Sequence, residues 1–192
     1  MPNTTAIFRP LAGILSLTLI IGTGAIAQAQ QPKLEMHRVG VNADDGSGWH
    51  SAVSTKGSFS IRVPIPFNDF TTRDEGTGEV SHVIGGKSSE GIKFAAIELP
   101  VTAKTPADLG TILKSFSSKP ANKVSDVSRS TKDGVEVLSF SVTGSATSAH
   151  FRYFRMKSTL YMLSIEFPNA QRELAAATKD GFFGSFKLKG KS

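Results

Sequence analysis

Short segments in which apolar and polar residues alternate constrain the fold of this chain more than any other feature. Phe59, Ile61 and Val63 are separated by polar residues, and a period of two predicts a strand with one buried face. A glycine-rich loop separates segments 79–84 and 91–99, which predicts an antiparallel pair. Four more strands are predicted at 122–130, 135–143, 149–157 and 159–167. An antiparallel sheet is therefore expected.

Two segments have helical spacing instead. The first begins at Thr105, a candidate cap followed by proline, and its apolar residues recur at helical spacing until the segment ends before Pro120. The second covers residues 169–180, with an asparagine cap, an alanine-rich middle and Gly181 as the expected stop. Residues 186–188 alternate and predict a short closing strand. This order predicts an α+β fold, an antiparallel β-sheet with helices packed on it.

The first 29 residues have the pattern of a secretory signal peptide. Arg9 is their only charged residue, residues 11–21 form a short apolar run, and residues 27–29 are a small-x-small site. We expect cleavage near Ala29 and a periplasmic or secreted protein. The alternative is a retained membrane anchor, but spanning needs about 20 mostly apolar residues, and this run contains glycine, serine and threonine. No transmembrane segment is therefore expected after cleavage.

The absence of cysteine limits how an exported protein of this length can be stabilised. Without cysteine, the fold must hold by packing alone, and thiol chemistry and cysteine metal sites are excluded. Removing 29 of the 192 residues leaves 163, which fits one domain. Residues 30–48 are polar and end in Asn, Asp, Gly and Ser, which predicts a flexible leader. We therefore expect a single folded domain at 49–192.

The chain is basic, with a formal net charge of +6 and a pI near 9.7. Cleavage would lower the charge to +5, because only Arg9 is lost. This charge permits weak attraction to anionic surfaces. The lysines and arginines are scattered rather than clustered with stacking aromatic residues, so we expect no nucleic-acid partner.

No motif in the chain has the spacing of a catalytic or metal site. Residues 86–88 match the end of a phosphate-binding loop, but Ser81 occupies the position of its first glycine, and a strand is predicted to follow. In residues 42–46 the glycine comes one position too early for a calcium loop. The histidines form no paired metal-ligand motif, and no G-x-S-x-G element occurs. We therefore predict no catalytic residue, metal site or cofactor.

Three segments, taken in their order and spacing, are similar to those of a known family. They are residues 57–64 as an opening strand with proline, residues 105–109 at the start of a central helix, and residues 182–188 at the end. The chain resembles the PsbP-like fold, which is shared with the Ran-binding Mog proteins and many small exported bacterial proteins. The resemblance covers most of 49–188 and implies an α/β/α sandwich and a largely non-enzymatic binding or assembly role, with no common catalytic residues to transfer.

Two segments are candidates for a recognition surface. The strand 150–157 combines arginine with aromatic residues, which are enriched at binding hot spots, and the loop 66–70 contains two phenylalanines where the PsbP-like proteins often have a tryptophan. The alternative is that the aromatic side chains are core and the arginines are edge residues. The candidate binding residues are Phe67, Phe70, Arg152, Tyr153 and Arg155.

Two functions of different class are consistent with these observations. The preferred hypothesis is an exported, non-catalytic binding or assembly module whose partner is a protein or another component of the cell envelope. It predicts an exposed apolar or aromatic patch on one face of the sheet. The alternative is a small periplasmic hydrolase acting on an envelope substrate. That function requires His82 or His150 in a cleft within reach of a serine or an acid.

Overall fold

The structure is a computed structural model that describes residues 33–75, 78–102, 108–132 and 134–189. The predicted signal peptide lies outside the described residues. Residues 31–192 form a compact unit by themselves.

The described chain forms eleven strands and two α-helices. The strands of the large sheet, in spatial order, are β1 (Lys33–Val41), β4 (Phe67–Arg73), β5 (Val80–Lys87), β6 (Lys93–Pro100), β10 (Thr159–Pro168), β9 (Thr147–Met156), β8 (Val135–Thr143) and β7 (Lys123–Lys132). A small sheet contains β11 (Lys187–Leu188), β3 (Phe59–Val63) and β2 (His50–Val53). The helices are α1 (Leu109–Ser117) and α2 (Arg172–Gly184), and the short 3₁₀ helix η2 (Asn169–Gln171) precedes α2.

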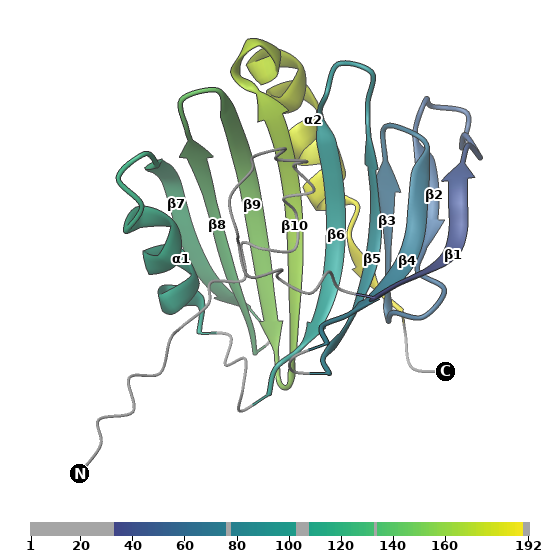
Figure 1. Ribbon diagram of the computed structural model, residues 1–192, viewed down its shortest axis with the longest axis horizontal. Helices are drawn as coiled ribbons and strands as arrows, with labels where there is room; N and C mark the ends of the chain where they lie inside the picture. The colour runs from purple at the N-terminus through teal and green to yellow at the C-terminus, as the bar shows by residue number, and fades with distance from the viewer. Residues whose placement is uncertain (1–32, 76–77, 103–107, 133, 190–192) are drawn as a thin grey trace, which may run out of the picture. The chain divides into compact units, whose positions relative to one another are not determined.

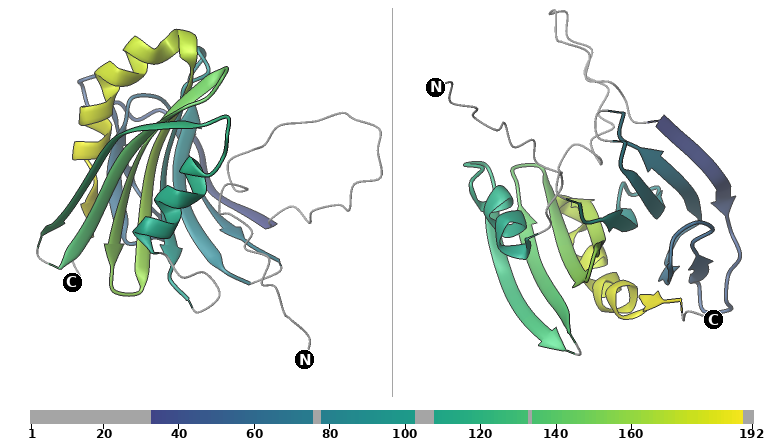
Figure 2. Two further views of the ribbon diagram at one scale, coloured as in Figure 1. Left: turned by 90° about the vertical axis from the view of Figure 1, so that its left-hand side faces the viewer. Right: turned by 90° about the horizontal axis from the view of Figure 1, so that it is seen from below.

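The elements form a β-rich fold, so the predicted α+β fold with an α/β/α sandwich is wrong. Of the described residues, 55% lie in strands and 17% in helices. One eight-stranded antiparallel sheet dominates it (Figure 1), and α1 and α2 lie on opposite faces of that sheet (Figure 2). The physical reason is that α1 has only nine residues and that the small sheet, rather than a further helix, completes the layer on the α2 side.

The main core lies between the large sheet and the layer formed by α2 and the small sheet. Alternate side chains of β10, from Tyr161 to Phe167, point into it and meet Phe59, Ile61 and Val63 of β3. The alternation predicted for β3 is confirmed. Burying each large apolar side chain stabilises the fold by about 1.5–3 kcal/mol. From α2 the core receives Ala175, Phe182 and Phe183.

α1 is capped by Asp108, whose carboxylate accepts a hydrogen bond from the Thr111 backbone N–H at 2.7 Å. The predicted cap, Thr105, lies outside the described residues. The ring of Phe116 contacts Phe140 and Phe151 on the large sheet, with centroid separations of 5.2 and 4.8 Å. These contacts hold α1 on the face opposite α2.

Both ends of α2 differ from the prediction. Asn169 lies in η2, where its side-chain oxygen accepts a hydrogen bond from the Ser148 hydroxyl at 2.6 Å instead of capping the helix. Gly181 does not end the helix, which continues to Gly184. A Cβ atom at Gly181 would lie 3.0 Å from the ring of Trp49. The close approach of that ring, together with burial of the two phenylalanines after Gly181, outweighs the cost of glycine in a helix, about 1 kcal/mol.

Three strands lie where no strand was predicted. β1 occupies residues 33–41 of the expected leader and pairs with β4 at the edge of the large sheet. Its register shifts between Met36 and Arg38, so its side chains do not alternate simply between faces. β4 contains the expected loop residues Phe67 and Phe70, and β2 has only four residues.

Candidate functional site

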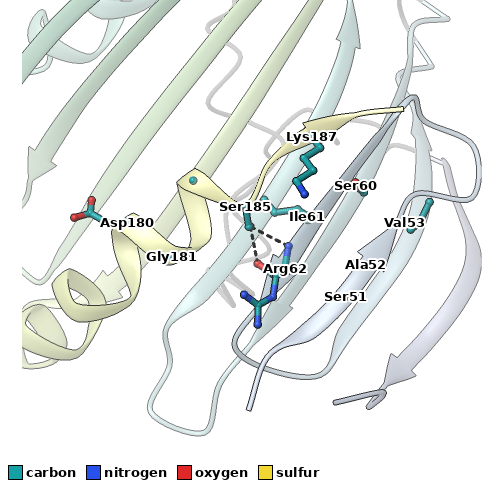
Figure 3. A pocket seen from close by; sticks show the side chains of 11 residues that line it. Ser51, Ala52, Val53, Ser60, Ile61, Arg62, Asp180, Gly181, Ser185 and Lys187 are labelled. Carbon is teal, nitrogen blue, oxygen red and sulfur yellow. Dashed lines mark hydrogen bonds between the residues drawn. The ribbon is translucent and has the colours of Figure 1, made fainter. Parts of the chain in front are cut away.

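A groove of about 550 Å³ lies between the outer face of the small sheet and the end of α2 (Figure 3). Because Phe59, Ile61 and Val63 point into the core, Ser60 and Arg62 of β3 face outward. We call this cavity the groove. It is lined by Ser51, Ala52, Val53, Ser60, Ile61, Arg62, Asp180, Gly181, Gly184, Ser185 and Lys187.

The two walls of the groove are joined through Ser185. Its hydroxyl oxygen accepts a hydrogen bond from the Arg62 backbone N–H at 3.0 Å, and its proton is directed to the Phe182 carbonyl at 2.8 Å. Figure 3 shows this contact between the end of α2 and β3. Gly184 adds no side chain to the helix wall, and a Cβ atom there would meet nothing within 4 Å. The groove is thus open along the last turn of α2.

Two of the charged residues of the groove are free of ion pairs with other described residues. Arg62 donates to the Asp45 carboxylate at 2.7 Å and to the Ser47 hydroxyl at 2.6 Å, and its guanidinium lies 5.7 Å from the centre of the Trp49 ring. Its charge is therefore balanced. Lys187 and Asp180 are exposed and make no ion pair within the described part of the chain.

A second, smaller cavity of about 100 Å³ lies between α2 and strands β7–β9. The Ser141 hydroxyl is 2.9 Å from His150 Nδ1. The Ser141 side chain is the main cause of a lowered pKa at Asp126, and the Ser125 hydroxyl donates to the Asp126 carboxylate at 3.2 Å. Asp126 has a positive φ of 53°, uncommon for a residue other than glycine. We call this cavity the His150 pocket. It is lined by Asp126, Ser139, Phe140, Ser141, His150, Phe151, Arg152, Lys179, Asp180 and Phe183.

Burial is the main cause of a lowered pKa at His150, and the nearby Lys179 and Arg172 lower it further, whereas Asp126 opposes them. The ring is therefore neutral at pH 7. The hydrogen bond between Ser141 and His150 Nδ1 forms in either direction, according to the tautomer of the ring. His150 Nε2 is buried and has no hydrogen-bond partner in the described residues.

Arg152 is one of the five predicted binding residues, and the structure places it in the His150 pocket. Its guanidinium lies 5.0 Å from the centre of the Phe183 ring, and its Nε donates to the Ser139 hydroxyl at 3.1 Å. Burial lowers the pKa of Arg152, and Asp180 counteracts that effect. Arg152 is thus held between the sheet and α2.

The other four predicted binding residues lie elsewhere. Tyr153 points to the opposite face of β9, is only 5% exposed and has its pKa raised by burial. Arg155 shares that face and lies 4.0 Å from Glu136. Phe67 is fully buried, and Phe70 pairs with Met36 in the register of β1 and β4. The structure does not bring the five residues into one site.

The remaining histidines form no metal site. Thr71 Oγ1 lies 2.8 Å from His37 Nε2 and 3.2 Å from His82 Nδ1, and His50 is buried. Among residues 33–75, 78–102, 108–132 and 134–189, no three His, Cys, Asp or Glu side chains gather so that they could hold a metal ion. Within the part of the chain that the structure describes, His150 is the only histidine that meets a serine and an acid in a pocket.

Sequence reasoning missed the groove because its residues come from segments about 120 positions apart. One signal was present: the alternation that buries Phe59, Ile61 and Val63 also places Ser60 and Arg62 on the outside. Nothing in the sequence indicated that the end of α2 lies opposite them.

Comparison with known proteins does not identify a family. No protein-family model matches the chain, and no curated protein matches it. The resemblance to the PsbP-like proteins stays a prediction.

No helix within the described ranges has the length and apolar character needed to cross a membrane.

Proposed function

We propose that this protein is an exported, non-catalytic binding module of the cell envelope that takes its partner into the groove. The observation that carries the proposal is the groove itself. Its volume of about 550 Å³ lies within the range of ligand sites, roughly 300–1,000 Å³. It also combines an exposed Val53 with serine hydroxyls and with the exposed charge of Lys187, which makes no ion pair within the described chain.

Two features of the sequence support a partner in the cell envelope. The first 29 residues have the composition of a signal peptide, which directs the chain out of the cytoplasm. The positive net charge favours contact with anionic surfaces, which are abundant in cell envelopes.

In-cell crosslinking of the tagged, exported protein tests the proposal. Gly184→Trp adds a large side chain to a residue that lines the groove, at a position where a Cβ atom meets nothing within 4 Å. Leu174→Trp is the matched control on α2, because Leu174 is 47% exposed and does not line the groove. We expect one envelope component in the adducts, lost in Gly184→Trp and retained in Leu174→Trp. Identical adducts from both variants would contradict the proposal.

A second candidate function, a small periplasmic hydrolase acting on an envelope substrate, is favoured by one observation. The Ser141 hydroxyl lies 2.9 Å from a neutral His150, which is the contact between a nucleophile and its base. Asp126, however, forms no hydrogen bond with the histidine ring: within the described residues Nδ1 bonds to Ser141 and Nε2 has no partner. A fluorophosphonate probe distinguishes the two functions. A hydrolase would be labelled, and the label would be lost in Ser141→Ala but kept in Ser139→Ala, a serine of the same pocket.

A further inference from the structure

The sheet wall of the groove carries a net positive charge. Lys187 is opposite Ser60 in the register of β11 and β3, so both side chains are on the outer face of the small sheet. Lys187 is exposed there and makes no ion pair with another described residue. Arg62 lies on the same face but is paired with Asp45. Within the described part of the chain, Lys187 is thus the cation that this wall leaves for a ligand.

Two hydroxyl groups lie on the same wall as this cation. Ser60 is the cross-strand neighbour of Lys187, and Ser51 is opposite Arg62 in the register of β2 and β3. Both serines line the groove, and neither side chain hydrogen-bonds to another residue in the described part of the chain. Residues directly opposite each other on one face of a sheet have Cβ atoms about 4.5–5.5 Å apart. The Lys187 ammonium and the Ser60 hydroxyl can therefore bind the same anionic group.

The helix wall of the groove offers little charge in return. Figure 3 shows the Asp180 carboxylate turned away from the groove, and Asp180 acts on the charge of Arg152 in the His150 pocket. The Gly181 and Phe182 carbonyls accept hydrogen bonds from the Ser185 backbone N–H at 3.2 and 3.3 Å. The two glycines of the lining add no side chain. This wall is therefore mostly backbone, and the polar groups named here are already bonded.

An apolar side chain continues the row that contains the cation. Val53 is opposite Ser60 in the register of β2 and β3, so Val53, Ser60 and Lys187 form one row across the small sheet. Val53 is 50% exposed. The volume of about 550 Å³ is in the range of sites for small organic molecules. A ligand of that size would meet a cation and a hydroxyl at one end of the row and apolar surface at the other.

We infer that the groove binds an amphipathic organic anion, with its anionic group against Lys187 and Ser60 and its apolar body along Val53 and the last turn of α2. The inference rests on the proposed function, because it names the class of ligand that the same groove takes. An organic cation would be repelled by Lys187, and a neutral sugar would leave that charge unmatched.

Calorimetric titration of the exported protein with a set of octyl compounds tests this inference. Octanoate and octyl phosphate are anions, octanamide is a neutral analogue, and octylammonium carries the opposite charge. We expect at least one of the anions to bind about three- to tenfold more tightly than octanamide, as for a charge pair that is partly open to solvent and is helped by a hydrogen bond. Octylammonium is expected to bind most weakly. A preference between the two anions identifies the anionic group as a carboxylate or a phosphate.

Substitutions of Lys187 locate the anionic group of the ligand. Lys187→Gln is expected to reduce the affinity of the anions to that of octanamide, whereas Lys187→Arg keeps the charge and should keep the preference for anions. Lys123→Gln is the charge-matched control, because Lys123 is exposed and does not line the groove. Gly184→Trp should weaken the binding of anions and octanamide alike, and Leu174→Trp should leave both unchanged.

Three outcomes overturn the inference. One is equal binding of the anions and octanamide, and another is a preference for anions that persists in Lys187→Gln. The third is no binding of either anion by a protein whose envelope adducts are still lost in Gly184→Trp. In that last case the groove is the binding site, but its ligand is not an amphipathic anion. Adducts that survive Gly184→Trp would instead contradict the proposed function.

Discussion

The groove and the His150 pocket both border α2, but their polar groups are arranged differently. In the His150 pocket, the Ser141 hydroxyl is hydrogen-bonded with His150 Nδ1, and Arg152 is held between Ser139 and Phe183. In the groove, Lys187 is exposed and makes no ion pair within the described chain, whereas Asp180 also lines the His150 pocket and acts on the charge of Arg152. Charges in the pocket therefore act mainly on the stability of the fold, whereas the charge of Lys187 in the groove is available to a ligand.

The largest expected effect comes from the core that supports both cavities. Phe182 is fully buried and packs edge-on against Phe94, with ring centroids 5.3 Å apart. Phe182→Ala should lower the free energy of unfolding by about 3–5 kcal/mol, as measured by urea titration. Leu174→Ala, at an exposed position of the same helix, should change it by less than about 0.5 kcal/mol. Similar losses in both variants would mean that α2 is not anchored by its C-terminal half.

A matched pair of glycines sharpens the comparison at the helix end. Gly181→Ala places a Cβ atom 3.0 Å from the rigid ring of Trp49, whereas Gly184→Ala enters open space. Overpacking costs about 1–3 kcal/mol, and alanine gains about 1 kcal/mol of helix propensity. We expect Gly184→Ala to be the more stable variant by about 1–2 kcal/mol in thermal unfolding. The reverse order would place the Trp49 ring elsewhere.

Acid should affect the His150 pocket. The pKa of His150 is lowered in the folded protein, first by burial and then by Lys179 and Arg172 of α2, against the opposing effect of Asp126 on β7. Below a pH of about 6.5, His150 therefore binds a proton more readily in the unfolded chain than in the folded protein. The folded state consequently loses stability as the pH falls from about 6.5 towards the pKa that His150 has in the folded protein.

Urea titrations at a series of pH values between 7 and 5 check this effect. The wild type should lose stability more steeply than His150→Gln over that range. Lys179→Gln should have an intermediate slope, because it removes one of the charges that oppose protonation. Parallel curves for the wild type and His150→Gln would show that His150 does not contribute.

The smallest expected effect on stability comes from the groove. Lys187 is exposed and is unpaired within the described chain, so Lys187→Gln should change the free energy of unfolding by less than about 0.5 kcal/mol. A large loss of stability would mean that Lys187 holds the small sheet in place and would remove the contrast between the two cavities.

The local sequence pattern predicted the strands whose buried side chains face a single core. The alternation at β3 and the paired segments of β5 and β6 are present, as are β7 to β10. β1 was not predicted, because an edge strand with a register shift lacks a simple period of two. β4 was not predicted because it is largely polar, and it buries Asp69 in a hydrogen-bonded pair with Arg38. A polar residue that finds its partner in another segment looks like a loop residue in the sequence.

The candidate site likewise combines features that the sequence predicted with features that it did not. Arg152 was singled out from its sequence neighbours, but Arg152 and Arg155 lie on opposite faces of β9, since an odd spacing reverses the side of a strand. The groove could not be located from sequence, because it exists only where β3 meets the end of α2.

The sequence by itself determined the turn positions, the buried faces of most strands and a fold held together without disulfides, because these depend on residue type and on periods of two or 3.6. Only the tertiary structure decided the length of α2, the additional strands and the position of the groove. Gly181 remains helical because Trp49 packs closely against it, and this packing involves residues more than 100 positions apart. Contacts of that kind are decided by packing energy and leave no periodic signal in the chain.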